Sequence, residues 1–229
     1  MLKFARRAIG VVLYNCSMFG VVMFATAQTF RWWRAWALLG VITITTVIDL
    51  LTVLRRQKDL LSERMKPVLQ QGQPVADKIV LVLFMLSYGG QVAVAGLDVF
   101  HWHLFSKPPL IVSCAGTLMF LIGWWLIRLT FEANAFATVV VRHQTEREHV
   151  VVDSGIYRFV RHPLYAGVSL SAIGMALWLE SYAATITALL PIGLLAIRIG
   201  FEEKFLRRAL AGYAAYTQRV RYRLIPKVW

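Results

Sequence analysis

Apolar residues along the chain occur in long runs that are separated by short polar segments. The runs cover residues 8–30, 35–54, 79–99, 109–127, 164–179 and 182–201. Most of them reach or approach the roughly 20 residues that a helix needs to cross the hydrocarbon of a bilayer. The pattern predicts an all-α integral membrane protein with about six transmembrane helices, the fifth and sixth forming a hairpin. Helical spacing over residues 202–218 predicts a further, cytoplasmic helix at the C-terminus.

Composition and charge agree with this interpretation. Of the 229 residues, 58% are hydrophobic and only 16% are charged, which leaves too little polar surface for a water-soluble globule. The net charge of +13 could indicate nucleic-acid binding, but the cations lie in alternate connections between the apolar runs. This is the positive-inside pattern, and it predicts that both termini face the cytoplasm. The other connections carry five tryptophans, as an interfacial aromatic belt does: Trp32, Trp33, Trp36, Trp102 and Trp178.

Three sequence features argue against other kinds of chemistry. Cys16 and Cys114 both fall within predicted spans, and the histidines have no spacing typical of a metal site. We therefore expect neither a disulfide framework nor a bound metal. The sequence also has no glycine-rich nucleotide motif of the soluble type.

The densest cationic cluster lies in "GIYRFVRHPLYAG", residues 155–167. Pro163 suits the first position of a helix, which places His162 at the cap. A helix start has free N–H groups that can bind a carboxylate or a phosphate, and Arg158 and Arg161 add positive charge beside it. The cluster is either such an anion site or a set of arginines that contact lipid head groups, and its spacing leaves both interpretations open.

Arg198 and Glu202 form a second candidate pair near the end of the last apolar run. Four residues apart, they share one face of a helix. An ionisable residue within an apolar run is costly and points to function. The alternative is that Arg198 extends to the membrane surface and pairs with Glu202.

Three stretches of the C-terminal third together resemble a known family. They are "HVVVDSGIYRFVRHPLYAG" at 149–167, "RIGFEEKFL" at 198–206 and "GYAAYTQRVRYRLIP" at 212–226. Their joint pattern is similar to that of the isoprenylcysteine carboxyl methyltransferases and the related phospholipid methyltransferases. The N-terminal half, including "LLSERMKP" at 60–67, is similar to bacterial members. The resemblance implies a four-span membrane region at 1–130 and a methyltransferase core at 131–229, in a bacterial-type inner membrane.

The resemblance also implies a cofactor and a set of site residues. The cofactor is S-adenosylmethionine, which donates a methyl group to a lipophilic acceptor in the bilayer. Arg198 matches the arginine that faces the acceptor. The residues that match cofactor contacts are Gln144, His149, Val150, Val151, Val152, Tyr157, His162, Pro163, Leu164, Tyr165 and Glu202.

The acceptor is not determined by these residues. Arg198 favours carboxyl O-methylation, because a guanidinium can hold a carboxylate by charge-assisted hydrogen bonds. N-methylation of a phospholipid amine and S-methylation of a small thiol remain alternatives. A sterol-reductase-like enzyme that uses NADPH and a non-catalytic membrane scaffold are two further alternatives.

Overall fold

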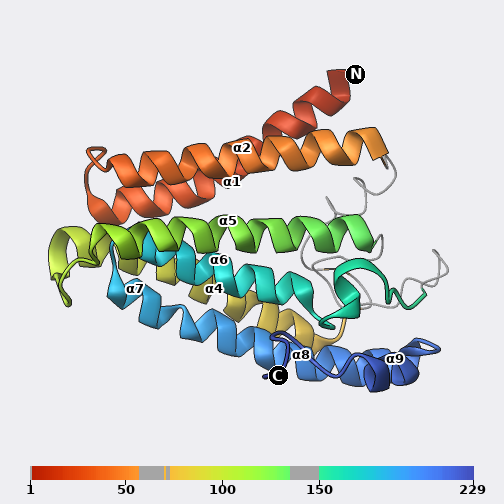
Figure 1. Ribbon diagram of the computed structural model, residues 1–229. Helices are drawn as coiled ribbons and strands as arrows, with labels where there is room; N and C mark the ends of the chain where they lie inside the picture. Colours follow the sequence, from red (N-terminus) through yellow and green to blue (C-terminus); the bar gives the residue numbers. More distant parts are fainter. Residues whose placement is uncertain (1, 57–69, 71–72, 135–149) are drawn as a thin grey trace.

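A computed structural model describes residues 2–56, 70, 73–134 and 150–229, and every regular element in this part of the chain is helical. The helices pack side by side in an elongated bundle (Figure 1). Their bounds are α1 Leu2–Ala27, α2 Trp33–Arg56, α4 Val75–Leu97, η1 Asp98–Trp102, α5 Leu110–Ala133, η3 Gly155–Arg158, α6 Pro163–Trp178, α7 Tyr182–Thr187, α8 Leu189–Ala209 and α9 Tyr213–Arg219.

The apolar runs of the sequence are the helices of the bundle. By length and composition, five stretches among the described residues could cross a membrane. They are Gly10–Ala27, Trp33–Thr52, Val75–Trp102, Leu110–Ala133 and Tyr182–Ala209. The fifth predicted run is α6, which is apolar but only 16 residues long. The prediction of an all-α membrane protein is confirmed, with five long helical stretches and one shorter helix.

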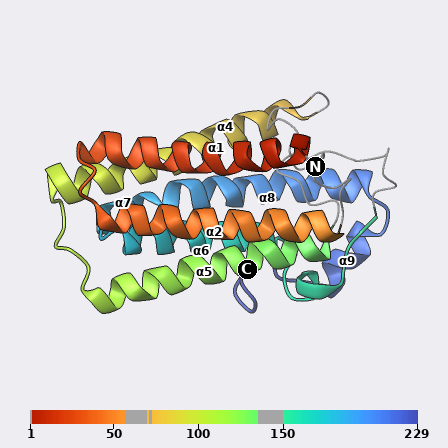
Figure 2. The same cartoon turned by 90° about the horizontal axis from the view of Figure 1, so that it is seen from above.

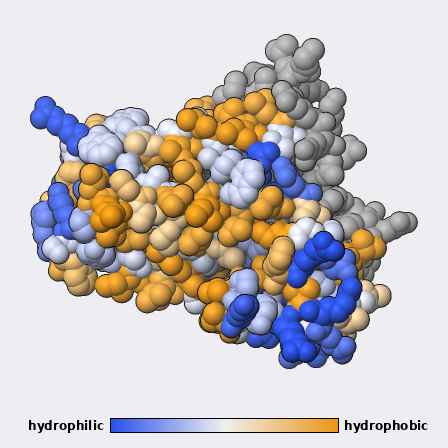
Figure 3. All heavy atoms as spheres, in the orientation of Figure 1, coloured by the Kyte–Doolittle hydropathy of each residue, from blue (hydrophilic) through white to orange (hydrophobic). Residues whose placement is uncertain are grey.

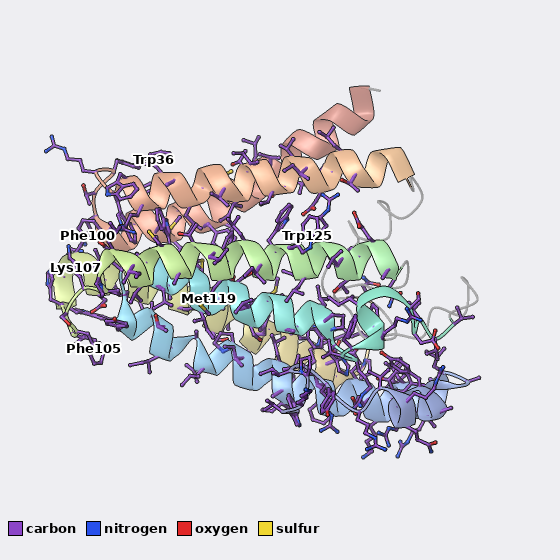
Figure 4. All side chains as sticks on the ribbon, in the orientation of Figure 1. Trp36, Phe100, Phe105, Lys107, Met119 and Trp125 are labelled. Atoms are coloured by element: carbon purple, nitrogen blue, oxygen red, sulfur yellow. The ribbon has the colours of Figure 1, made fainter. Side chains whose placement is uncertain are left out.

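The two ends of the bundle differ in their side chains. The start of α1 and α9 lie at one end, and the connections from α1 to α2, from η1 to α5 and from α6 to α7 lie at the other (Figures 1 and 2). The labelled Trp36, Phe100 and Phe105 belong to this second end (Figure 4). Trp36 is exposed there, as an aromatic belt requires, whereas Trp32 is buried against Phe100. Hydrophobic residues cover much of the visible long side, and hydrophilic residues gather near α9 (Figure 3).

Glycines let α5 and α6 pack at close range. Gly116 and Gly123 on α5 face Gly174 and Gly167 on α6. A Cβ atom added at Gly123 would lie 2.5 Å from the carbonyl oxygen of Gly167. Small residues at such positions allow helix backbones to approach in a membrane. This packing sets the position of α6, whose first turn carries the histidine, proline and tyrosine of the cationic motif.

Polar contacts fix the end of the bundle opposite α9. Arg34 pairs with Glu180 at 2.9 Å, and its guanidinium carbon lies 4.8 Å and 4.7 Å from the ring centroids of Trp33 and Trp178. The buried Asp98 accepts a hydrogen bond from the Ser181 hydroxyl at 2.7 Å. These contacts attach α2 and η1 to the turn between α6 and α7, the hairpin that the sequence predicts.

The C-terminal helix differs from its prediction. The expected continuous helix over 202–218 is broken between Ala209 and Tyr213. Gly212 has φ 81° there, a left-handed conformation that glycine adopts without strain. The break turns α9 away from α8. The division of the chain at residue 130 and the cytoplasmic orientation of the termini stay predictions.

Candidate active site

The start of α6 has the geometry that the sequence predicts, but its donors are used within the protein. Pro163 is the first helical residue and His162 is the N-cap. The N–H groups of residues 165–166 donate to the His162 carbonyl, at 3.1 and 3.2 Å. Those of Arg161 and His162 donate to the carbonyls of residues 222–223, both at 2.9 Å. The helix start therefore offers fewer amide donors to an anion than we expected.

Glu203 binds the buried Arg161 and His162 of the motif. Arg161 donates from Nε to Glu203 Oε1 at 2.7 Å, and His162 Nε2 lies 3.2 Å from the same oxygen. Arg223 donates from Nε to Glu203 Oε2 at 3.2 Å. The side chains of Arg161, His162 and Glu203 are all 5% exposed or less. We call these four residues the tail latch, because they attach the C-terminal tail to α6 and α8.

The latch differs from both sequence interpretations of the cluster. Arg161 Nη1 also donates to the carbonyls of Val220 and Arg221, at 2.6 and 2.8 Å. Arg161 thus binds the protein's own tail instead of an external anion or a lipid head group. Arg158 remains exposed. The spacing within the motif could not indicate this, because Glu203 and the tail are some 40 to 60 residues away in the sequence.

A second polar cluster, the cavity tip, consists of Asp77, Tyr165, Arg198 and Glu202. Arg198 donates from Nε to Asp77 Oδ1 at 2.8 Å and from Nη2 to Asp77 Oδ2 at 3.3 Å. The Tyr165 hydroxyl donates to Glu202 Oε2 at 2.6 Å. The guanidinium carbon of Arg198 lies 5.7 Å from the centroid of the Tyr165 ring. The tip therefore joins α4, α6 and α8.

Asp77 is a site residue that our sequence interpretation missed. We considered Glu202 as the partner of Arg198, whereas the structure pairs Arg198 with Asp77 and Glu202 with Tyr165. Gln73 supports Asp77 by donating from Nε2 to its Oδ2 at 2.6 Å. A signal was present, because Asp77 is an acid next to the third apolar run and a buried arginine needs a counter-ion.

Arg198 and Tyr165 of the cavity tip line an apolar cavity of about 440 Å³. Helices α1, α4, α5, α6 and α8 contribute to its walls. The lining includes Phe84, Tyr88, Ile127, Leu164, Tyr165 and Arg198. A cavity of this size with few polar groups can enclose a lipophilic molecule, while the polar groups orient one end of it.

A smaller pocket of about 210 Å³ adjoins the same cluster. Asp77 and Glu202 line it, together with the cations Lys204 and Arg208 and several apolar residues. Arg198 and Tyr165 line the large cavity, and their partners Asp77 and Glu202 line the small pocket. The residues of the cavity tip thus line both the large apolar cavity and a small pocket that carries charges of both signs.

The structure brings together some of the predicted cofactor contacts. The rings of His162 and Tyr165 are stacked at 5.6 Å, and His162 Nδ1 lies 4.0 Å from Glu202 Oε2. Pro163 is buried behind them, and Leu164 lines the large cavity. These residues and Arg198 form one connected region.

Two of the other predicted contacts, Tyr157 and Val151, lie beside α9. Tyr157 accepts a hydrogen bond from Asn134 Nδ2 at its hydroxyl, at 3.1 Å, and one from the Tyr216 hydroxyl at its carbonyl, at 2.8 Å. Val151 packs against a cluster of buried residues that includes Tyr213 and Tyr216. Val150 is exposed and Val152 is half-buried, and Gln144 and His149 lie outside the described residues.

Two tyrosines of α9 remain neutral at physiological pH. Burial raises the pKa of the Tyr213 phenol well above its usual value, and the negative charges of Glu202 and Glu203 raise it further. Burial likewise raises the pKa of Tyr216, whose hydroxyl donates to the Tyr157 carbonyl. Both phenols can therefore act as hydrogen-bond donors at this end of the bundle. Among the described residues, no group of three or more His, Cys, Asp or Glu side chains could hold a metal ion.

The fold and the site define an all-α membrane protein with a polar cluster beside an apolar cavity, and comparisons with known proteins make this class more specific. The model of the phospholipid methyltransferase family matches residues 111–212. Over 112 residues the chain is 33% identical to the probable protein-S-isoprenylcysteine O-methyltransferases of Oryza sativa subsp. indica and japonica. The protein-S-isoprenylcysteine O-methyltransferase B of Arabidopsis thaliana is 29% identical over a segment of the same length. Each match covers 48% of this chain, but only 57 to 59% of the relative's own length.

The fold is similar to that of a solved membrane enzyme. This is the eukaryotic intramembrane Ras methyltransferase ICMT, isoprenylcysteine carboxyl methyltransferase, with a TM-score of 0.54 and 18% identity. The match covers 99% of this chain and 85% of that one. The likeness at this identity concerns the fold alone. The sequence matches cover less than half of this chain and agree with the resemblance of its C-terminal third to the isoprenylcysteine carboxyl methyltransferases and the phospholipid methyltransferases.

Proposed function

We propose that the protein is an S-adenosylmethionine-dependent methyltransferase that methylates a carboxylate on a lipophilic acceptor. The observation that carries this proposal is the position of Arg198 in the lining of an apolar cavity of about 440 Å³. A lipid tail fits the apolar walls, and a guanidinium binds a carboxylate through parallel N–H groups. The relatives named as protein-S-isoprenylcysteine O-methyltransferases support an S-isoprenylcysteine as the acceptor class.

The residues beside the tip suit the proposed methyl donor. S-adenosylmethionine carries an ammonium, a carboxylate and an aromatic base. The Glu202 side chain, 22% exposed, can pair with the ammonium, and the nearby His162 and Tyr165 provide aromatic rings and hydrogen-bonding groups. Glu203 is unsuited to this role, because the tail latch already uses both of its oxygens.

The chain's own residues would contribute alignment and exclusion of water. When bound, S-adenosylmethionine supplies a methyl group that is already activated as a sulfonium. Arg198 would hold the acceptor carboxylate, so that one of its oxygens forms the new bond to the methyl carbon as the carbon–sulfur bond breaks. An ionised carboxylate has no proton to lose, so the step needs no general base. Positioning of the reacting atoms in a dry site accounts for most of the expected acceleration.

One observation supports a second candidate function. The matching family model describes phospholipid methyltransferases, and the small pocket combines the acids Asp77 and Glu202 with the cations Lys204 and Arg208. Such a pocket could bind a head group with an ammonium and a phosphate, so a phospholipid amine is the alternative acceptor.

A labelled methyl donor distinguishes the two acceptors. The purified protein is incubated with an N-acetylated S-isoprenylcysteine or with phosphatidylethanolamine vesicles, and the lipid product is then treated with base. Base releases the label from a methyl ester and leaves it on a methylated amine. Thermal unfolding with S-adenosylhomocysteine or NADPH tests the cofactor, and stabilisation by NADPH alone would contradict a methyltransferase.

We also infer the orientation of the protein in the membrane. The end of the bundle that carries α9 is rich in cations, including Arg207, Arg208 and Arg219, and the positive-inside pattern assigns such an end to the cytoplasm. In a bacterial-type inner membrane, a water-soluble donor would then enter from the cytoplasm and the acceptor from the bilayer. A reporter fused to the C-terminus, active only in the cytoplasm, tests this orientation.

A further inference from the structure

Asp77 is a part of the cavity tip that alignment of an acceptor by Arg198 does not by itself require. Its side chain is 3% exposed and lies in the first turn of α4. One oxygen accepts the Arg198 Nε–H at 2.8 Å. The other accepts from Arg198 Nη2 at 3.3 Å and from Gln73 Nε2 at 2.6 Å. Asp77 thus binds Arg198 side-on, as the carboxylate of a ligand would.

This arrangement creates a competition between two carboxylates. Arg198 lines the large cavity while its guanidinium binds Asp77, so a carboxylate held by Arg198 in the cavity would lie close to the carboxylate of Asp77. That second carboxylate would share one cation with the negative charge of Asp77. In a site sheltered from water, such like charges repel more strongly than they do in solution.

We propose that Asp77 is the resident counter-ion of Arg198 and that its negative charge weakens the binding of an acceptor carboxylate. The proposal rests on the proposed function, because it assumes a carboxylate acceptor. In the empty cavity Asp77 compensates a cation whose burial would otherwise be costly. After methyl transfer the acceptor carries no charge, so Asp77 no longer repels it. Asp77 is therefore a positioning residue that sets acceptor affinity.

The variant Asp77→Asn tests this role, because it keeps the shape and one hydrogen-bond acceptor but removes the charge. For the full chain in detergent or vesicles, the KM for an N-acetylated S-isoprenylcysteine is expected to fall about tenfold. Inhibition by the methyl ester of the same compound should stay unchanged, because the ester has no charge to be repelled. A KM that stays the same or rises in a folded Asp77→Asn protein overturns the proposal.

Two other variants separate the charge effect from a loss of stability. Asp98→Asn changes a buried aspartate at the opposite end of the same helical stretch, where it binds Ser181. It should lower the melting temperature and leave the KM unchanged. Gln73→Met removes a hydrogen bond that partly compensates the negative charge of Asp77. Asp77 should then repel the acceptor carboxylate more strongly, so the KM should rise by about two- to threefold. This variant tests the proposal even if Asp77→Asn does not fold, since a KM that is unchanged or lower contradicts it.

A binding measurement distinguishes failure of this proposal from failure of the proposed function. Stabilisation of each folded variant is titrated with the carboxylate and with its methyl ester, without any turnover. Tighter carboxylate binding by Asp77→Asn supports the counter-ion role even if the wild type forms no ester. The absence of ester would refute only the proposed reaction. If the wild type forms the ester but Asp77→Asn binds the carboxylate no more tightly than the wild type does, the role of Asp77 is overturned and the proposed function stays in place.

Discussion

The cavity tip and the tail latch meet at consecutive residues of α8, yet they use similar side chains in different ways. Glu203 is 4% exposed and binds Arg161, His162 and Arg223, which come from the start of α6 and from the tail. Glu202 is 22% exposed and accepts a hydrogen bond from Tyr165 beside two pockets. Successive residues of an α-helix point about 100° apart, so the two carboxylates face different surroundings.

The difference separates stability from ligand binding. In the tail latch, a buried carboxylate and its cations compensate one another's charge, so the cluster holds chain segments together. In the cavity tip, the polar groups border an apolar cavity and a small charged pocket. Substitutions in the latch should therefore change unfolding, and those at the tip should change binding and turnover. Each prediction below tests this distinction.

The largest expected effect is that of Glu203→Ala. It leaves Arg161 buried without its carboxylate and releases the tail, so we expect a loss of about 3–5 kcal/mol in the free energy of unfolding. Denaturation in detergent measures the change. If Glu203→Ala unfolds like the wild type, the latch does not stabilise the fold.

Arg198→Ala should mainly affect turnover. Without the guanidinium the acceptor is not aligned with the methyl donor, and we expect kcat/KM to fall by about 100-fold or more. The affinity for S-adenosylhomocysteine should be unchanged, which calorimetry can measure. Arg207→Ala is the control for the loss of an arginine on the same helix, because Arg207 is 51% exposed and lies 4.0 Å from Glu203 of the tail latch, so that it should spare turnover. Equal loss of cofactor affinity in Arg198→Ala and Glu202→Ala would refute separate roles for these two residues.

Gly167→Ala should disturb both regions at once. The added Cβ would lie 2.6 Å from the Gly123 carbonyl oxygen, so α6 must move away from α5. Because the start of α6 belongs to the latch and to the tip, we expect about 1–3 kcal/mol of destabilisation together with lower turnover. Gly193→Ala is the matched control, since its Cβ would have no neighbour within 4 Å. Similar behaviour of the two variants would contradict the role of close helix packing.

Glu202→Ala should weaken cofactor binding with little effect on folding. The substitution removes a partly exposed carboxylate and leaves the latch intact, so we expect about tenfold lower affinity for S-adenosylhomocysteine. The melting temperature should stay within a few degrees of the wild type. Tyr165→Phe removes only the hydrogen bond to Glu202 and should have a smaller effect. A large loss of stability in Glu202→Ala would show that the tip, like the latch, is structural.

The smallest effect is expected at the surface pair of Arg219 and Asp153. Their side chains are 2.6 Å apart but are 67% and 44% exposed. Arg219→Ala should change the free energy of unfolding by less than about 1 kcal/mol, because solvent screens such a pair. A change as large as that of Glu203→Ala would mean that burial does not account for the strength of the latch.

Much of the site could be predicted from the sequence, but not its pairing. The Pro163 helix start follows from the motif and agrees with the structure. The resemblance to a family groups His162, Tyr165 and Glu202, and their side chains lie close together in the structure, whereas their role in cofactor binding stays a prediction. The partner of Arg198 does not follow, because Asp77 is 121 residues away in the sequence. Helical spacing predicts which residues share a face, but not which other helix will lie against that face.

The sequence by itself determined most of the helices, their membrane character and the resemblance to a family, because apolar run length, charge position and local motif are properties of neighbouring residues. The tertiary structure decided which charges compensate one another and which remain beside a cavity. In this structure Glu203 and Arg161 bind each other and the C-terminal tail, and Asp77 binds Arg198. The physical reason is that a charge in a poorly hydrated interior must find a partner within a few ångströms, and packing of distant helices determines that partner.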